Sequence, residues 1–368
     1  MIETSHIEEL SKLSISKLKE RIRLIKEEIP EEKRKIITYS KNFTLSLSNY
    51  CSNFCKYCFY NYKVLGDTDK QNTTLLDKKE IKSLINDAIK YDCKEGLLLS
   101  GDNPESFLEV RTELQKLGFD RYINYVKDIC DLLLKKNILP HINIGLLNTK
   151  QFKVLKDFTA SMGLMLESTC ADLFKKGGVH ENSPGKLPER RKKHLINAGK
   201  LKIPFTTGIL IGIGESLNDR ISDLFLIKDI HEKYGHIQEV IIQNFEPKKG
   251  ISYQPKRKIL LEEFLKIAGI ARVIFQNEIS IQVPPNLIRG NEKMFIEMGI
   301  NDFGGISPVT IDFINPKNKW PQIGFLTRIC ENIGYKLKER LPVYPKFINK
   351  SSFLSNKIKK VVNKYSLI

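Results

Sequence analysis

The sequence lacks long apolar runs. No stretch of its 368 residues approaches the ~20 consecutive apolar residues that cross a bilayer. The first ten residues, MIETSHIEEL, are charged and helical in character, and they lack the apolar core of a signal peptide. We therefore expect a cytoplasmic protein that does not act at a membrane.

Cysteine is scarce, and its pattern excludes a disulfide framework. The chain has seven cysteines, and an odd number cannot all be paired in disulfides within one chain. Three of them fall close together, whereas the other four stand alone in apolar or amphipathic surroundings. We expect these four to be small buried hydrophobic residues: Cys93, Cys130, Cys170 and Cys330.

The chain carries a net charge of +17, yet its central part lacks a concentrated basic segment. Most lysines stand at helical spacing beside glutamate and aspartate, a pattern typical of solvated helix faces. Residues 346–368 are basic without acidic partners. This tail could contact RNA, but we favour a solvated terminal helix. We expect no nucleic-acid partner.

Short apolar runs alternate with amphipathic stretches, which predicts a parallel sheet with helices outside. Eight such runs without an evident linker or low-complexity segment predict one (β/α)8 barrel of the TIM type over residues 41–345. A helical extension is expected at 1–40, and the basic tail follows at 346–368. The expected strands are residues 43–47, 95–99, 138–144, 161–166, 205–211, 238–243, 279–283 and 302–307, and the expected helices include 78–91, 122–136, 189–200, 217–234 and 260–275.

The three clustered cysteines follow the first expected strand in the sequence NYCSNFCKYCFYNY. Cys51, Cys55 and Cys58 have the spacing C-x3-C-x2-C. Thiolates suit iron-sulfur clusters, and three of them can hold three corners of a [4Fe-4S] cube while one iron stays open. A zinc site is the alternative, but structural zinc usually has four nitrogen or sulfur ligands. The spacing, at the end of a first barrel strand, resembles the signature of the radical S-adenosylmethionine (SAM) superfamily.

This resemblance implies that the open iron binds the amino and carboxylate groups of SAM. Other motifs at expected strand ends resemble the remaining SAM contacts of the superfamily. They are Gly101, Asp102 and Glu105 in LSGDNPE, Glu167 in MGLMLEST, and Gly212 and Glu215 in GILIGIGE. Read without the resemblance, SGDNPE is equally well an ordinary turn that starts a helix. Tyr57, just before the third cysteine, would offer its backbone to the adenine.

Further polar residues stand within or after the expected strands. His141, Asn143 and Gln243 are our candidates for catalytic residues, because they could point into the barrel. The alternative is that each serves the structure, by turn chemistry, by helix capping or, for His141, as a satisfied core histidine. The acid and base of the reaction are not identified by the sequence.

Longer strings narrow the resemblance to one family. ASMGLMLEST, GHIQEVIIQNF and DFGGISPVTIDFINP, in this order, resemble the 7,8-didemethyl-8-hydroxy-5-deazariboflavin synthases, and the match is to the component that closes the deazaflavin ring. The match runs from about residue 42 to 345. The N-terminal extension and the basic tail lie outside it.

The family implies a reaction and its partners. A 5′-deoxyadenosyl radical would take a hydrogen from 5-amino-5-(4-hydroxybenzyl)-6-(D-ribitylimino)-5,6-dihydrouracil. Ring closure with loss of ammonia would then give the deazaflavin precursor of coenzyme F420. A second radical SAM enzyme would make this adduct and deliver it free or within a complex, and a low-potential donor would supply electrons. With one cysteine triad and room for one barrel, this chain should carry half of the pathway.

Two other protein classes are alternatives to this hypothesis. A sulfur-inserting radical enzyme on the same barrel would need a second set of cysteine ligands, which the four isolated cysteines do not form. A cluster-bearing tRNA-modifying protein would need a grouped basic surface and usually an added RNA-binding module. The barrel portion has neither.

Overall fold

The computed structural model describes residues 4–64, 72–350 and 352–365. Eight parallel strands follow one another around a closed barrel, in which β1 pairs with β2 on one side and with β8 on the other. The predicted (β/α)8 fold is therefore confirmed. The barrel strands are β1 (Ile36–Ser48), β2 (Glu95–Ser100), β3 (Leu139–Asn143), β4 (Ser161–Gly163), β5 (Phe205–Ile211), β6 (Ile237–Asn244), β7 (Ser280–Gln282) and β8 (Asp302–Ile306).

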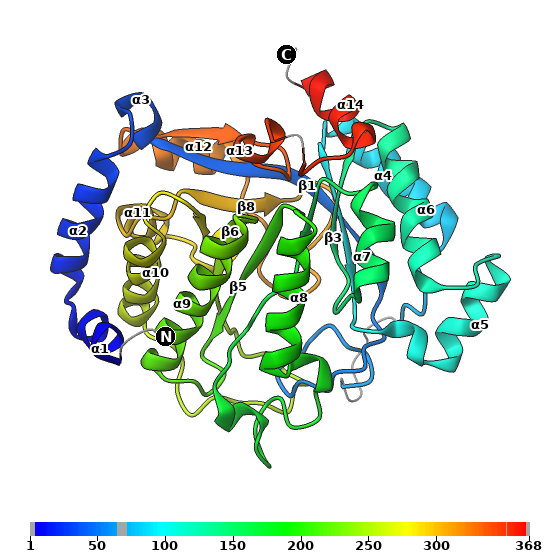
Figure 1. Cartoon of the computed structure of the whole chain (residues 1–368), viewed down its shortest axis with the longest axis horizontal. Helices are drawn as coiled ribbons and strands as arrows, with labels where there is room; N and C mark the ends of the chain where they lie inside the picture. Colours follow the sequence, from blue (N-terminus) through cyan, green and yellow to red (C-terminus); the bar gives the residue numbers. More distant parts are fainter. Residues whose placement is uncertain (1–3, 65–71, 351, 366–368) are drawn as a thin grey trace.

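Helices cover the outside of the barrel (Figure 1). Several are amphipathic and bury an apolar stripe toward the barrel. In α4, for example, Ile81, Ile85 and Ala88 are buried, and the Asp77 side chain caps the first turn. The helices between β1 and β8 are α4 (Lys78–Lys90), α5 (Leu108–Lys116), α6 (Tyr122–Lys135), α7 (Thr149–Lys156), α8 (Pro188–Lys200), α9 (Leu217–Tyr234), α10 (Leu261–Phe275) and α11 (Glu292–Glu297).

The N-terminal extension consists of three helices: α1 (Thr4–Lys12), α2 (Ile15–Glu27) and α3 (Glu31–Arg34). Leu18 and Ile22 of α2 are buried, and α2 packs along α10. Gly269 of α10 faces this contact, and a Cβ there would lie 2.3 Å from Met298 Cε, so the position has no room for a side chain. Strand β1 already begins at Ile36, earlier than the expected barrel start at residue 41.

The chain after β8 closes the opposite end of the barrel from the cysteine loop. Helix α12 (Ile323–Asn332) leads into β9 (Lys336–Glu339), an additional strand that pairs with the first residues of β1. Residues 340–344, here called the floor segment, then cross the N-terminal ends of the strands. Helices α13 (Pro345–Ile348) and α14 (Asn356–Tyr365) pack beside it, at the top of Figure 1.

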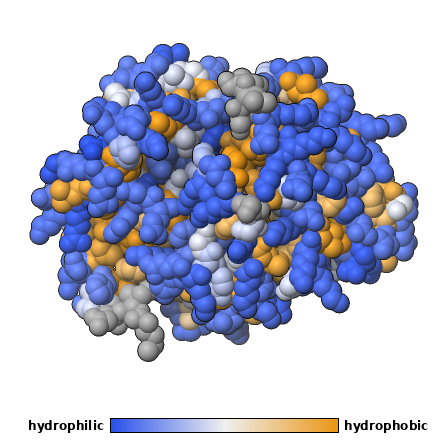
Figure 2. Space-filling model, turned by 45° about the horizontal axis from the view of Figure 1, so that its top comes forward, coloured by the Kyte–Doolittle hydropathy of each residue, from blue (hydrophilic) through white to orange (hydrophobic). Residues whose placement is uncertain are grey.

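The expected solvated tail is thus partly a packed one. Ile358, Val361 and Val362 of α14 are buried in a cluster with Leu139 and Ala160, at the starts of β3 and β4. The remaining face of α14 carries the lysines. Hydrophilic side chains dominate this face of the molecule, with smaller apolar patches between them (Figure 2). None of the described helices is both long and apolar enough to cross a bilayer.

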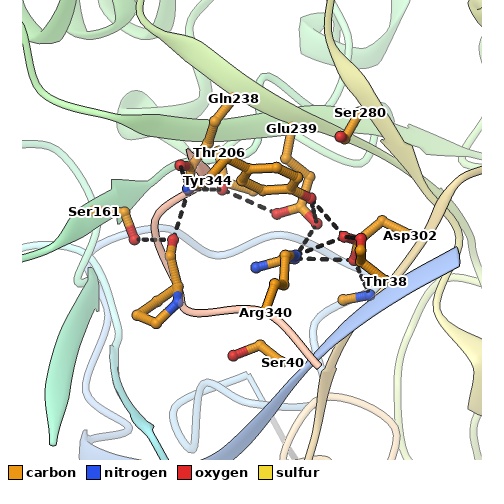
Figure 3. Close-up of polar contacts among 12 residues, drawn as sticks. Thr38, Ser40, Ser161, Thr206, Gln238, Glu239, Ser280, Asp302, Arg340 and Tyr344 are labelled. Carbon is orange, nitrogen blue, oxygen red and sulfur yellow. Dashed lines mark hydrogen bonds and ion pairs between the residues drawn. The ribbon is translucent and has the colours of Figure 1, made fainter. Parts of the chain in front are cut away.

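A buried charge cluster joins the floor segment to the strands (Figure 3). The guanidinium of Arg340 donates to Asp302 of β8 at 2.6 Å and to Glu239 of β6 at 2.8 Å. The hydroxyl of Tyr344 lies 2.7 Å from the Asp302 carboxylate, to which it donates, and 3.2 Å from the carboxyl group of Glu239. Such a buried network holds its partners in one arrangement, because leaving any charge unpaired is costly.

Candidate active site

Two adjoining cavities occupy the barrel. The cluster cavity, of about 280 Å³, lies at the C-terminal ends of the strands and is lined by Cys51, Cys55 and Cys58. The barrel cavity, of about 200 Å³, lies below it along the barrel axis and reaches Arg340 and Pro342 of the floor segment. Asn143 and Gln243 line both cavities, so they stand where the two meet.

The three thiols of the cysteine loop are surrounded by hydrogen-bond donors. Cys51 Sγ accepts from the backbone amide of Asp102 at 3.1 Å, and Cys58 Sγ accepts from those of Tyr60 and Asn61 at 3.3 Å. Ser183 Oγ donates to Cys55 Sγ at 3.3 Å. Hydrogen bonds to cysteine sulfur are among the features that tune iron-sulfur clusters.

Burial raises the pKa of the Cys51 thiol to about 12 and also raises that of Cys55. Thiolates in such surroundings need a strong counter-charge, which iron supplies. Among the described residues, no three His, Cys, Asp or Glu side chains could hold a single metal ion. The loop surrounds a space rather than a point, which suits a four-iron cluster better than one zinc ion.

Gly101 and Asp102 hold the cysteine loop in place. A Cβ on Gly101 would lie 2.0 Å from the carbonyl oxygen of Tyr50, so only glycine fits against the loop. The Asp102 carboxylate accepts from Asn53 Nδ2 at 2.8 Å and from the backbone amide of Leu146 at 3.0 Å. It therefore ties together the loops after β1, β2 and β3, and it also lines the cluster cavity.

Glu167 lines the cluster cavity and is held in an unusual conformation. Its φ is +67°, and its backbone bonds to Gly208 and Leu210 of β5 fix it there. Lys186 donates to its carboxylate at 2.5 Å, and both side chains are only 12% exposed. Lys186 and Arg191 also line this cavity. No sequence motif marks these two cations, because Lys186 ends a single 3-10 turn (Pro184–Lys186) and Arg191 lies in the first turn of α8.

Glu105, Gly212 and Glu215 do not line either cavity. The carboxylate of Glu105 accepts from Arg121 and from the amide of Tyr122 instead. Glu215 accepts from the amides of Gly212 and Ile213 and from Arg220, so it closes its own turn. The structure therefore does not bring these three residues to the other predicted SAM contacts, and it gives both carboxylates structural partners.

The remaining predicted residues do face the cavities. Tyr57 lines the cluster cavity, with its hydroxyl 2.9 Å from His180 Nε2. His141 lines only the barrel cavity and not the cluster cavity. Asn244, at the end of β6, also lines the cluster cavity, and within the described residues its buried Oδ1 has no hydrogen-bond partner. An amide oxygen left in this state fits a site that receives a hydrogen-bonding ligand.

Comparisons with known proteins agree with this geometry. The family model described as the radical SAM superfamily matches residues 45–227. The curated protein named 7,8-didemethyl-8-hydroxy-5-deazariboflavin synthase from Methanococcus vannielii is 46% identical over 89% of this chain and 91% of its own length. The protein of the same name from Methanocaldococcus jannaschii is 43% identical over 89% of this chain and 88% of its own length.

The fold has solved counterparts as well. The FeFe-hydrogenase maturase HydG from Carboxydothermus hydrogenoformans aligns with a TM-score of 0.68 at 19% identity, covering 91% of this chain and 79% of the maturase. At that identity the likeness shows the fold alone.

The site fits the cofactors of the superfamily, a [4Fe-4S] cluster and SAM. Cys51, Cys55 and Cys58 would hold the cluster, while Glu167, Tyr57 and the free amide oxygen of Asn244 line the space beside it. From this site, the superfamily match and the identity over most of both chains, we conclude that the chain belongs to the radical SAM superfamily and, within it, to the 7,8-didemethyl-8-hydroxy-5-deazariboflavin synthase family.

Proposed function

We propose that this protein is the lyase that closes the deazaflavin ring. Its substrate would be 5-amino-5-(4-hydroxybenzyl)-6-(D-ribitylimino)-5,6-dihydrouracil, and its products 7,8-didemethyl-8-hydroxy-5-deazariboflavin and ammonia. The observation that carries the proposal is the junction of the two cavities. A long substrate in the barrel cavity can present one group to the cluster cavity past Asn143 and Gln243.

The wall of the barrel cavity changes character along its length, and this change suits the proposed substrate. Near the junction it includes the apolar residues Leu99, Leu164 and Ile241. Farther down it becomes polar and includes Glu95, Thr206, Glu239 and Arg340. An aromatic hydroxybenzyl group matches the upper part, and a ribityl chain with its hydroxyls matches the lower part.

When bound, the cluster and SAM supply the 5′-deoxyadenosyl radical that takes a hydrogen from the substrate. The chain's own residues position the two reactants. Glu167 and Lys186 form a nearly buried ion pair at the cofactor side, and the residues shared by the two cavities would keep the reacting group near it. Holding reactants at near-attack distance, roughly 3–3.5 Å, is the main contribution a protein makes to such a step.

The proposal requires two partners. A second radical SAM enzyme would attach the hydroxybenzyl group and supply the adduct, either free or within a complex. A low-potential electron donor would reduce the cluster. Neither partner is part of this chain, which has one cysteine triad and one barrel.

The test is anaerobic reconstitution of the cluster followed by incubation with the adduct, SAM and a reductant. We expect fluorescent deazaflavin, ammonia, methionine and 5′-deoxyadenosine in equal amounts. The Cys58→Ala protein is the matched control and should form none of them. Cleavage of SAM by the wild-type protein without deazaflavin would contradict the proposed substrate.

A further inference from the structure

His141 of β3 is held by a chain of two hydrogen bonds that begins in the floor segment. Its Nδ1 lies 2.7 Å from Ser161 Oγ, and Ser161 Oγ donates to the carbonyl oxygen of Pro342 at 2.8 Å. Figure 3 shows Ser161 directed at the floor segment. A hydroxyl has one hydrogen, which here goes to Pro342. Nδ1 of His141 must therefore carry the proton and donate to Ser161.

The other ring nitrogen is consequently an acceptor that faces the barrel cavity. A neutral imidazole protonated at Nδ1 has a lone pair at Nε2. Across the described part of the chain, nothing forms a hydrogen bond with this atom. His141 lines the barrel cavity, and burial together with the nearby Arg340 lowers its pKa to about 3. The ring is therefore neutral at physiological pH and a weak base, suited to accept a hydrogen bond rather than to remove a proton.

Gly163 of β4 keeps this nitrogen accessible. A Cβ on Gly163 would lie 2.9 Å from His141 Nε2. Gly163 is not among the glycines with positive φ, so its backbone conformation does not require glycine. Glycine is needed here because a larger side chain would occupy the space beside the imidazole. Gly163 itself also lines the barrel cavity.

The position of His141 along β3 indicates which part of a ligand it meets. Side chains two residues apart in a strand share a face, and they are separated by roughly 7 Å. Asn143 stands at the junction with the cluster cavity, so His141 lies one such step farther from the cofactors. The same region holds Asn42, whose buried Oδ1 also has no hydrogen-bond partner among the described residues. Two unpaired acceptors in one cavity call for a ligand rich in donors.

We propose that His141 is a specificity residue that accepts, through Nε2, a hydrogen bond from a hydroxyl of the ribityl chain. The inference rests on the proposed function for the identity of the ligand. Ser161 and Pro342 are positioning residues in this scheme, because they fix the tautomer without touching the ligand. The floor segment thereby helps to determine what the barrel cavity binds.

The test compares two fluorescent deazaflavins that differ only in their side chain. Holoenzyme without SAM is titrated with the ribityl product and with the analogue that carries a methyl group in place of ribityl. His141→Asn keeps an amide near Nδ1 but places nothing at Nε2. It should weaken binding of the ribityl compound about five- to tenfold, the value of one hydrogen bond, and leave the methyl analogue unchanged. His141→Gln, which can place an oxygen near Nε2, should recover most of the loss.

Two further variants test the arrangement around the ring. Gly163→Ala should crowd Nε2 and weaken ribityl binding as His141→Asn does. Ser161→Ala removes the hydroxyl that fixes the tautomer of His141. It should produce a smaller loss of binding affinity, again confined to the ribityl compound. Iron content and SAM affinity should match the wild type in all four variants, which shows that the barrel is folded.

Several outcomes would overturn the inference. Unchanged binding of the ribityl compound by His141→Asn would show that Nε2 accepts no hydrogen bond from a ribityl hydroxyl. Equal weakening for the ribityl and methyl compounds would show that the donor lies on the ring system or that His141 acts only in folding. Failure of the proposed function would give a different experimental result. The adduct would then remain unconverted by the wild-type protein, whatever the two deazaflavins show.

Discussion

Cys51, Cys55 and Cys58 differ from the other cysteines in what surrounds their sulfur atoms. Each accepts a hydrogen bond from a backbone amide or a hydroxyl, and all three line one cavity. Cys130 and Cys330, in contrast, are fully buried within the hydrophobic core. The first three cysteines are arranged to bind a cluster, whereas Cys130 and Cys330 pack as small apolar residues in the core.

Replacing any one of the three by alanine should abolish the visible absorbance of the cluster and all turnover, because three thiolates are the minimum for this site. Cys130→Ala and Cys330→Ala are the matched controls. They should retain full iron content and lose about 1–3 kcal/mol of unfolding free energy. Iron and acid-labile sulfide analysis checks the prediction. A core cysteine that proved necessary for iron would contradict the ligand assignment.

Glu167→Gln keeps the shape of the side chain but removes its charge. Lys186 then loses its counter-charge, and any charge-assisted hydrogen bond to SAM is weakened, a loss of about 1.5–3 kcal/mol when such a bond is well made. We expect SAM affinity to fall about tenfold or more with unchanged iron content, measured by equilibrium binding. Glu105→Gln is the control, since Glu105 lies outside both cavities, and it should bind SAM normally. Unaltered affinity in Glu167→Gln would make that residue purely structural.

The glutamates also show what sequence can and cannot predict about a site. Glu105, Glu167 and Glu215 all follow expected strands, and all three were predicted to contact SAM. Only Glu167 faces a cavity, because the other two accept hydrogen bonds from amides and arginines within their own loops. Sequence places a carboxylate at the correct end of a barrel, but its direction depends on loop packing. The cations Lys186 and Arg340 were missed for the same reason.

The floor segment is an element without regular secondary structure, and its stability rests on Arg340. Arg340→Met would leave the carboxylate of Asp302 buried without its cation, which typically costs about 3–5 kcal/mol. We expect a lower midpoint in chemical denaturation of that size. Arg328→Met, at an exposed position on α12, should leave the midpoint unchanged. An equal loss in both variants would point to a general effect of charge removal.

Glu239 should make stability depend on pH in a particular direction. Burial raises the pKa of its carboxyl to about 7, although Arg340 opposes the shift. The folded protein then holds a proton that the unfolded chain releases above its ordinary pKa of about 4.3. Unfolding free energy should therefore fall as pH rises through this window, by on the order of 2 kcal/mol between about pH 5 and about pH 8.

Glu239→Gln should remove this part of the pH dependence, while the exposed Glu189→Gln should keep it. Denaturation curves for the three proteins at both pH values check the prediction. A slope that is the same in Glu239→Gln and in the wild type would assign the titration to another group.

At the scale of elements, the sequence predicted what burial dictates. Each of the eight barrel strands coincides with an expected apolar run, because both faces of a parallel barrel strand are covered. Strand β9 was missed, since its sequence KLKE is half exposed and reads as a solvated segment. Helices α5, α7, α11 and α12 lie outside the helical stretches that the sequence analysis named. Of these, α7 and α11 are short, and tertiary packing rather than periodicity stabilises them.

The whole molecule has one open end and one closed end. The floor segment and α14 cover the N-terminal ends of the strands, while the cysteine loop and the cluster cavity occupy the opposite end. We therefore expect a substrate to enter from the side of the cluster cavity, and to enter before SAM if its tail reaches the barrel cavity.

We expect this protein and its partner to divide the two radical steps of the pathway between them. One triad of cysteines supplies one radical-generating site, and the cavity beyond it is long enough for a ligand that reaches from the junction to the floor. Free tyrosine would fill only part of that space, so it would not be held at the roughly 3–3.5 Å of a near-attack geometry. Given SAM, reductant, tyrosine and 5-amino-6-ribitylaminouracil, the pure protein should form no deazaflavin.

Supplied with the adduct instead, it should form deazaflavin, and deuterium on the benzylic carbon should appear in 5′-deoxyadenosine, because that carbon becomes part of the new ring. Mass spectrometry of the nucleoside reads out the label, and adduct labelled on the ribityl chain is the control that should transfer none. Deazaflavin formed from tyrosine by this chain alone would contradict the division of labour. Label that stays on the benzylic carbon would move the abstraction to another hydrogen while leaving the product unchanged.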